Sequence, residues 1–303
     1  MADDLVFDTQ PPAQPGACTR LSPLVRRVVA NNPGPITFTG TCSYIVGRGH
    51  VAIVDPGPDL PDHVDALLQA VRGETVTHIL VSHTHRDHSP ASRAVQAATG
   101  APILGCSVHR TARPLALGEV NALEASVDLD YAPDQELGEG DVIEGNGWRL
   151  VAVETPGHMA NHLAFALPQE AALFSADHVM AWSTTVVAPP DGSMSAYMAS
   201  LDKLRAQDEA IYWPGHGGPV REPQRFVRAL AHHRRQREVS ILNRLAAGDR
   251  TIPEMVQAIY QGLKPALVGA AGLSVFAHLE DLVERGLVTA DGPPTLVSAY
   301  RLA

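Results

Sequence analysis

The segment that most constrains the fold is an apolar run that ends in a cluster of histidines. The run at residues 77–81 is mostly β-branched and aliphatic, and Ser-His-Thr-His-Arg-Asp-His follows it at residues 82–88. An apolar run of this length, broken by polar residues, predicts a buried strand that enters a loop at the edge of a sheet. Residues that carry out chemistry are common on such loops.

The spacing inside the cluster predicts ligands for two metal ions. In an extended segment His83, His85 and Asp87 point to one side, whereas His88 points elsewhere. We therefore expect His83 and His85 to bind one ion, and Asp87 and His88 to bind its neighbour. Imidazoles with a carboxylate and no thiolate suit Zn²⁺, and Mn²⁺ and iron accept similar ligands. The alternative is a solvated histidine-rich loop.

Three later segments repeat the pattern of a short apolar strand followed by a turn with a ligand-type side chain. Their recurrence argues against the solvated loop, because two coordination shells need more ligands than residues 83–88 provide. The side chains are His158, Asp177 and His216, and they follow strands predicted at 150–154, 173–176 and 211–213.

In order and spacing, these motifs resemble those of the metallo-β-lactamase-fold hydrolases. The motifs are H-T-H-R-D-H, T-P-G-H, S-A-D and P-G-H-G. The family usually has glycine before the bridging aspartate, where this chain has alanine. The resemblance implies that His83, His85 and His158 bind the first metal, that Asp87, His88 and His216 bind the second, and that Asp177 bridges the two.

The Asp-Pro-Gly-Pro segment that begins at Asp55 resembles another motif of this family. In that motif the aspartate lies behind the metals. We expect Asp55 to orient a ligand histidine, and not to bind a metal directly. A simple turn aspartate is the alternative.

The rest of the pattern predicts an α/β fold. Helical spacing at 61–71 and 91–99 alternates with apolar strands, and earlier strands are expected at 24–29, 36–38 and 44–46. The resemblance implies two sheets packed face to face with helices outside, which is a four-layer αβ/βα sandwich. In such a sandwich the strand ends that carry the ligands lie along one edge.

We expect three parts in the chain: a flexible lead-in over 1–20, a catalytic domain over 21–222, and a basic helix with a small domain over 223–303. The tail predicts helices at 239–247, 252–260 and 275–284 and then a hairpin, the order of a winged helix. Its third helix is acidic, so we expect no DNA binding. We interpret the tail as a pocket lid or as a contact between subunits of an oligomer.

The basic helix at 225–237 allows two interpretations. Its arginines are suited to bind phosphate or carboxylate groups, or they form a solvated face. Together with the tail, the helix resembles the lactamase-β-2-like branch of the family, which includes animal mitochondrial endoribonucleases. This resemblance extends from Asn32 to about Gly286.

Composition limits the partners and the compartment. With 23 basic and 33 acidic residues the net charge is −10, which argues against general attraction to nucleic acid or to anionic membranes. Three cysteines without C-x-x-C spacing predict a reduced, intracellular protein. The start of the chain has no export-signal pattern, and the apolar run at 266–277 is too short to span a bilayer. We expect a soluble, cytoplasmic protein.

These observations predict a dinuclear zinc-dependent hydrolase. Two cations that share a water lower its pKa towards neutrality, and the resulting metal-bound hydroxide would attack an ester, lactone, thioester, amide or phosphodiester bond of a small molecule. Asp87 would be both a ligand and the acceptor of the released proton. One alternative is an endoribonuclease-like phosphodiesterase acting on single-stranded RNA. The other is an iron-dependent oxidoreductase, although diiron members of the fold generally have glutamate where His85 stands.

Other polar residues near the motifs have less specific predictions. His162 and His178 are expected in the pocket wall or in structural hydrogen bonds, and His63 is expected on the surface. His109 and Arg110 either face substrate or are solvated.

Overall fold

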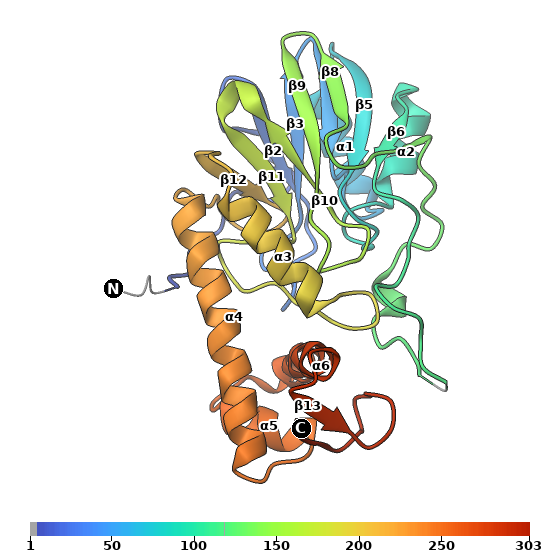
Figure 1. The fold of residues 1–303 in the computed structure, drawn as a ribbon. Coiled ribbons are helices and arrows are strands. Elements are labelled where there is room, and N and C mark those ends of the chain that lie inside the picture. The colour runs from blue at the N-terminus through green and yellow to red at the C-terminus, as the bar shows by residue number, and fades with distance from the viewer. Residues whose placement is uncertain (1–4, 118) are drawn as a thin grey trace.

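The computed structural model describes residues 5–117 and 119–303, and two β-sheets packed face to face form its centre (Figure 1). Within these residues the first sheet has seven strands in the order β1 to β7, and the second has five in the order β12-β11-β10-β9-β8. The strands are β1 Thr19–Arg20, β2 Val25–Val29, β3 Cys42–Arg48, β4 His50–Val54, β5 Thr75–Val81, β6 Ile103–Gly105, β7 Gln135–Glu136, β8 Val142–Gly145, β9 Trp148–Glu154, β10 Leu163–Leu167, β11 Ala172–Ala176, β12 Ile211–Pro214, β13 Val288–Ala290 and β14 Tyr300–Leu302.

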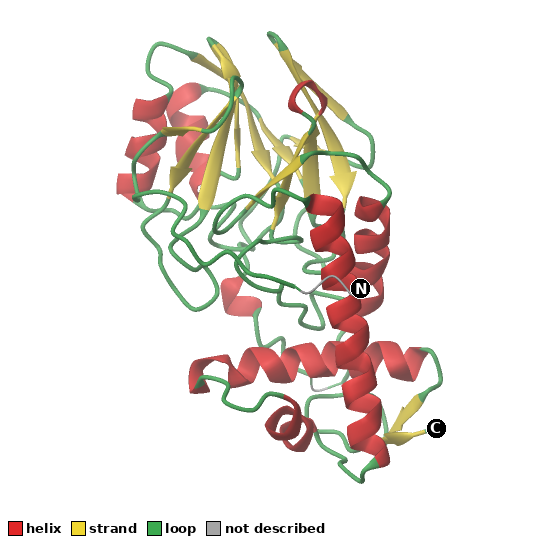
Figure 2. Ribbon diagram, turned by 90° about the vertical axis from the view of Figure 1, so that its left-hand side faces the viewer, coloured by secondary structure: helices red, strands yellow, loops and turns green. Residues whose placement is uncertain are grey.

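Helices cover the outer face of each sheet (Figure 2). Helices α1 and α2 lie on the first sheet, whereas α3 and the first half of α4 lie on the second. The predicted four-layer αβ/βα sandwich is therefore confirmed. The helices are α1 Pro61–Ala70, α2 Ala91–Thr99, α3 Met194–Arg205, α4 Pro223–Ala246, α5 Ile252–Ile259 and α6 Val268–Glu284.

The second sheet is apolar on both faces because it is buried on both. Along β10, Leu163 and Phe165 pack into the core between the sheets, while Ala164 packs into the core under α3 and α4. This division follows from the alternation of side chains along a strand.

The C-terminal part forms a third core beneath the sandwich, from the end of α4, α5, α6 and the β13–β14 hairpin (Figure 1). Thr251 and Glu254 form a reciprocal capping box at the start of α5. The helix predicted at 239–247 is not separate, because α4 runs unbroken for 24 residues. Its sequence contains no glycine or internal proline that would end it earlier.

The most apolar helical stretch is longer than the sequence suggests. Among the described residues, the stretch Pro265–Glu284 alone is long and apolar enough to cross a membrane by length and composition. Val275, Phe276 and Leu279 on this stretch are buried in the C-terminal core. This packing accounts for its apolar character within a folded domain.

Two local predictions differ from the structure. Residues 36–38 form a turn and not a strand, with Ile36 half exposed and Phe38 at a φ of 56°. His63 is buried and not on the surface, since it lies on the inner side of α1, where its Nε2 is 2.9 Å from the Ser43 hydroxyl. Burial lowers its pKa to about 4.

The lead-in predicted as flexible makes specific contacts with the sandwich. The Asp8 amide donates to the Ala181 carbonyl at 2.9 Å, and the Gly16 amide donates to the Val29 carbonyl at 2.9 Å. Strand β1 then pairs with β2. Residues 1–4 of this predicted segment, and Gly118 farther along the chain, lie outside the described residues.

Candidate metal centre

The predicted ligands meet at one end of the sandwich, because each follows the carboxyl end of a strand. The H-T-H-R-D-H segment follows β5 of the first sheet. The other three ligands follow β9, β11 and β12 of the second sheet. Face-to-face packing of the sheets brings these loops together, so both halves of the domain contribute. The residues gathered there are His83, His85, Asp87, His88, His158, Asp177 and His216.

One group of side chains has the composition predicted for the first metal. His85 Nδ1 lies 3.0 Å from His83 Nε2 and 2.9 Å from His158 Nε2. Asp177 Oδ2 lies 3.7 Å from His158 Nε2. One ligand atom from each of these four residues lies within 4.8 Å of the others. Three imidazoles and a carboxylate at such distances suit a divalent cation.

The second group has the composition predicted for the neighbouring metal. Asp87 Oδ2 lies 3.1 Å from His216 Nε2 and 3.4 Å from His88 Nε2. Asp177 also contacts this group, with Oδ1 3.5 Å from His88 Nε2 and Oδ2 3.4 Å from His216 Nε2. Asp177 therefore lies between the two groups, where a bridging carboxylate is expected.

The geometric argument from an extended segment is wrong beyond His85. Residues 86–88 form a turn, in which the His88 amide donates to the His85 carbonyl at 2.9 Å. This turn, and not strand alternation, separates Asp87 and His88 from the two preceding histidines. The structure divides these four side chains as predicted, but the turn at residues 86–88 is the cause.

Asp55 lies behind the cluster, as predicted. Its carboxylate accepts hydrogen bonds from the Ser82 amide and hydroxyl, each at 2.7 Å, and from His88 Nδ1 at 3.0 Å. The Ser82 hydroxyl in turn lies 2.9 Å from His83 Nδ1. One carboxylate thus supports a histidine of each group. The backbone of Asp55 has a φ of 48°, a left-handed conformation that aspartate tolerates better than most residues.

Three supporting contacts were not predicted. The Thr41 hydroxyl donates to Asp87 Oδ2 at 3.1 Å. His158 Nδ1 donates to the Val186 carbonyl at 2.6 Å, and His216 Nδ1 donates to the Gly40 carbonyl at 3.3 Å. A ring that donates through Nδ1 presents the lone pair of Nε2 to the site. The sequence carries no signal for the two carbonyls, because any residue type has one.

The histidines of the two groups differ in their protonation states. Burial lowers the pKa of His83, His85 and His158, to about 3 at His85, so these rings are neutral. Burial also lowers the pKa of His88 and His216, but the negative charges of Asp87 and Asp177 raise it by more. The pKa of His88 lies well above its usual value, and that of His216 rises to about 10.

The chemistry of the donors fits bound cations. His88 Nε2, His216 Nε2 and Asp177 Oδ1 are buried and have no hydrogen-bond partner. Buried polar atoms without partners are costly in a folded protein. A divalent ion between the groups would replace the two imidazolium protons and satisfy these atoms.

The remaining polar residues have structural contacts. His162 Nδ1 lies 2.8 Å from the Thr155 hydroxyl, and its ring stacks on His83 with centroids 5.0 Å apart. His109 Nε2 lies 3.2 Å from Asp191, and Arg110 donates to a backbone carbonyl. These contacts give His162 the structural role expected of it.

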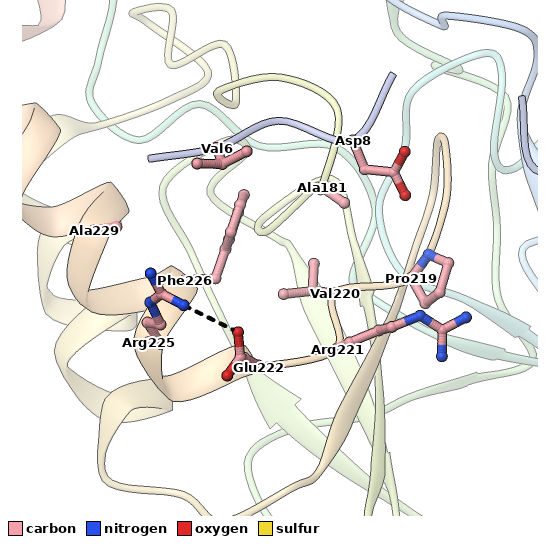
Figure 3. Close-up of a pocket in the computed structure, with 10 residues that line it drawn as sticks. All are labelled: Val6, Asp8, Ala181, Pro219, Val220, Arg221, Glu222, Arg225, Phe226 and Ala229. Carbon is pink, nitrogen blue, oxygen red and sulfur yellow. Dashed lines mark hydrogen bonds and ion pairs between the residues drawn. The ribbon is translucent and has the colours of Figure 1, made fainter. Parts of the chain in front are cut away.

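A separate pocket lies between the N-terminal segment and the start of α4 (Figure 3). Its lining includes Val6, Phe226 and an ion pair between Arg225 and Glu222. None of the predicted metal ligands lines it. The ligand cluster is therefore distinct from this pocket.

Two family models match the chain, and they agree with the division into sandwich and tail. The model of the metallo-beta-lactamase superfamily matches residues 36–216, the stretch that holds every predicted ligand. The chain belongs to the metallo-beta-lactamase superfamily. The beta-lactamase associated winged helix domain matches residues 251–293. Membership of this superfamily, together with the His/Asp cluster, makes the chain a metal-dependent hydrolase.

Several proteins are similar to this chain over most of its length. A Drosophila melanogaster protein named beta-lactamase-like protein 2 homolog is 29% identical over 89% of this chain and 91% of its own. An Aspergillus chevalieri protein named atrochrysone carboxyl ACP thioesterase is 29% identical over 85% of this chain and 79% of its own.

Solved structures agree on the fold. A metallo-beta-lactamase family protein from Thermus thermophilus aligns with a TM-score of 0.75 and 24% identity over 94% of this chain and 100% of its own. A beta-lactamase domain protein from Burkholderia ambifaria aligns with a TM-score of 0.79 and 20% identity over 96% of this chain and 95% of its own. Both alignments extend through the C-terminal part.

Proposed function

We propose that this member of the metallo-beta-lactamase superfamily is a dinuclear zinc-dependent hydrolase of thioesters. The observation that carries the dinuclear part is the position of Asp177, whose carboxylate lies between two complete groups of imidazoles. When bound, two Zn²⁺ ions would supply a water of lowered pKa and a Lewis acid for the carbonyl oxygen. His83, His85 and His158 would bind one ion, and Asp87, His88 and His216 the other.

Asp87 is the residue best placed to move a proton. Its side chain is 24% exposed, whereas those of His88, His158, Asp177 and His216 are between 0 and 6% exposed. This access lets the carboxylate exchange protons with solvent or with a leaving group. The Thr41 hydroxyl donates to Oδ2 and so helps to fix the carboxylate.

The thioester assignment rests on similarity. Two Aspergillus relatives, from A. chevalieri and A. terreus, are named atrochrysone carboxyl ACP thioesterase, and they are 29% and 27% identical to this chain over 85% and 80% of it. A thioester carbonyl is also chemically suited to attack by an activated water, because the thiolate is a good leaving group. We therefore place acyl thioesters first among the carbonyl substrates.

The RNA alternative loses part of its basis in the structure. Arg234 of the basic helix is buried, and the Arg237 guanidinium lies 4.1 Å from the centre of the Tyr260 ring. The Arg234 side chain is therefore not presented to phosphates, and Arg237 is half-buried against an aromatic ring. The iron alternative shares the same ligand types, so the bound metal itself must decide between hydrolase and oxidoreductase.

A substrate panel with matched variants tests the proposal. Zinc-loaded protein is assayed on acyl thioesters, lactones, a chromogenic β-lactam and single-stranded RNA, and the metals are quantified. We expect thioester hydrolysis, which falls by roughly 10² to 10⁴ in Asp87→Asn and is lost in His83→Ala. His50→Ala, at an exposed histidine, is the control and keeps full activity. Undiminished hydrolysis in His83→Ala, or iron with oxygen uptake, would contradict the proposal.

A further inference from the structure

Arg234, in the middle of α4, is a buried cation without an anionic partner. Its side chain is 3% exposed, and no carboxylate among the described residues forms an ion pair with it. Instead Nη2 donates to the Thr185 carbonyl and Nη1 donates to the Ser274 hydroxyl at 3.2 Å. The guanidinium also lies over the Tyr197 ring, 5.2 Å from its centre. Burying a guanidinium with so few partners is costly, so a role beyond filling space is expected.

The carbonyl that Arg234 binds belongs to the loop that supports two metal ligands. The Thr185 hydroxyl donates to the Asp177 carbonyl at 2.7 Å and also contacts the His178 carbonyl at 3.0 Å. The next residue, Val186, supplies the carbonyl that accepts from His158 Nδ1 at 2.6 Å. A shift of this short segment would move Asp177 and rotate His158 together.

Tyr197 supports the same region from α3. Its hydroxyl donates to the His178 carbonyl at 3.1 Å, and its ring packs on the His178 ring with centroids 4.6 Å apart. A Cβ on Gly157 would lie 2.4 Å from the Tyr197 Cα, so α3 lies directly against the turn that carries His158. Arg234 therefore contacts both structures that hold the ligand loop.

The remaining contact of Arg234 leads to the C-terminal domain. Ser274 is on α6, and it is buried among the residues of that domain. A second link joins the same helix to residues 107–135, since Arg113 bridges Glu280 on α6 and Glu119. The C-terminal domain thus reaches the sandwich through α6 at more than one point, and the contact with Arg234 leads to the loop that supports Asp177 and His158.

We propose that Arg234 is a positioning residue through which α4 and the C-terminal domain hold Asp177 and His158 at the metal centre. This inference rests on the proposed metal site. It gives the tail a function in the assembly of that site, in addition to the lid or subunit contact expected from its sequence. Replacing a purely structural arginine would change stability alone, whereas replacing a positioning arginine would also change metal binding.

The test compares metal binding in variants of the full chain. Arg234→Met removes both hydrogen bonds, Arg234→Lys keeps the charge but can reach only one acceptor, and Ser274→Ala removes only the α6 contact. Arg235→Met is the matched control, because Arg235 is the next residue of α4 and its side chain is 55% exposed. Zinc affinity is measured by competition with a chromophoric chelator, and the coordination is monitored by the visible spectrum of the Co²⁺ form.

We expect Arg234→Met to bind Zn²⁺ roughly tenfold to 100-fold more weakly and to change the Co²⁺ spectrum. Arg234→Lys and Ser274→Ala should show smaller losses, and Arg235→Met none. If Arg234→Met fails to fold, Arg234→Lys decides the question. Folded Arg234→Lys and Ser274→Ala proteins with unchanged zinc affinity and Co²⁺ spectrum would overturn the inference. Parent protein that binds no metal would instead overturn the proposed function, so the two failures are distinguishable.

Discussion

Single residues behind the ligands determine which ring nitrogen faces the metals. Asp55 accepts from His88 Nδ1, so His88 Nε2 faces Asp87 and Asp177. The carbonyls of Gly40 and Val186 do the same for His216 and His158. These acceptors touch no metal, yet they select the tautomer that can bind one.

Asp55→Asn should weaken metal binding without unfolding the protein. Asparagine tolerates the left-handed backbone at this position, but its amide would donate to His88 Nδ1 and so favour the proton on Nε2. We expect zinc affinity of the second group to fall roughly tenfold to 100-fold, as measured by chelator competition. Asp59→Asn, at an exposed carboxylate of the same segment, should behave like the parent. Equal affinity in both variants would contradict the role given to Asp55.

Gly215→Ala should displace ligands directly. A Cβ at this position would lie 2.4 Å from Asp177 Oδ1 and 2.6 Å from His88 Cε1, both far inside van der Waals contact. We expect a folded protein with reduced metal content and a fall in kcat, measured by metal analysis and thioester hydrolysis. Gly218→Ala is the control, because its Cβ would approach Asp8 only to 3.3 Å. Full metal content in Gly215→Ala would show that the ligands can move aside without loss.

The sequence motifs indicate the side chains that gather at the candidate metal centre and Asp55 behind them, but not the other groups that support them. Each ligand follows a recognisable apolar strand and belongs to a motif of residue types with metal chemistry. Thr41 and Arg234 belong to residue types with many other uses, and their roles depend on what folding places beside them. The burial of His63 is not predictable in this way, because its partner Ser43 lies on β3 and no local pattern places it beside α1.

At the scale of elements, the junction between α4 and α6 concentrates positive charge around a buried histidine. His278 of α6 is buried, and neither of its ring nitrogens has a hydrogen-bond partner. Burial first, and then Arg234, Arg237, His233 and Arg285, lower its pKa to about 3. The ring is therefore neutral in the folded protein under ordinary conditions.

This histidine should make the protein sensitive to acid. The unfolded chain takes up a proton at His278 near pH 6.5, whereas the folded chain does so only near pH 3, so stability decreases as pH falls through this window. From pH 7.5 to pH 5 the loss from this one group is about 2 kcal/mol. Urea unfolding of His278→Leu should show a pH dependence that is weaker by that amount. His50→Leu, at an exposed histidine, should leave the pH dependence unchanged, and a similar curve for parent and His278→Leu would refute the assignment.

Element boundaries show where sequence patterns are sufficient. The strands before the ligands lie close to their predicted positions, because apolar runs bounded by Pro-Gly turns leave few alternatives. Residues 36–38 have strand-like composition, but a turn replaces the strand and the Phe38 ring stacks on Trp182 with centroids 4.9 Å apart. That contact joins distant parts of the chain, and no local pattern predicts it.

At the scale of the whole molecule, the ligands divide between the two sheets. The first sheet supplies the H-T-H-R-D-H segment, and the second supplies His158, Asp177 and His216. Two bound metal ions would therefore link the sheets, in addition to the apolar core between them. The overall sandwich was predictable from motif order and resemblance, whereas the packing of the lead-in and the continuous α4 were not, because both depend on distant contacts.

Metal removal should accordingly lower global stability as well as activity. Without cations, the sheets lose these links and the ligand charges are balanced only by one another. We expect chelator-treated protein to unfold at a lower temperature and zinc to restore both Tm and hydrolysis. With free zinc at a thousandfold excess over Kd, the gain is about 4 kcal/mol. An unchanged Tm after complete removal, confirmed by metal analysis, would show that the centre contributes nothing to the fold.

The division of the ligands between the sheets also orders events during biosynthesis. A nascent chain that has left the ribosome only as far as β7 exposes His83, His85, Asp87 and His88 but has no partner loop to complete either set. Selective uptake of a cation must wait until translation has passed His216 and the second sheet has folded onto the first. The two groups of ligands are therefore completed only after most of the chain has been synthesised and the two sheets have packed together.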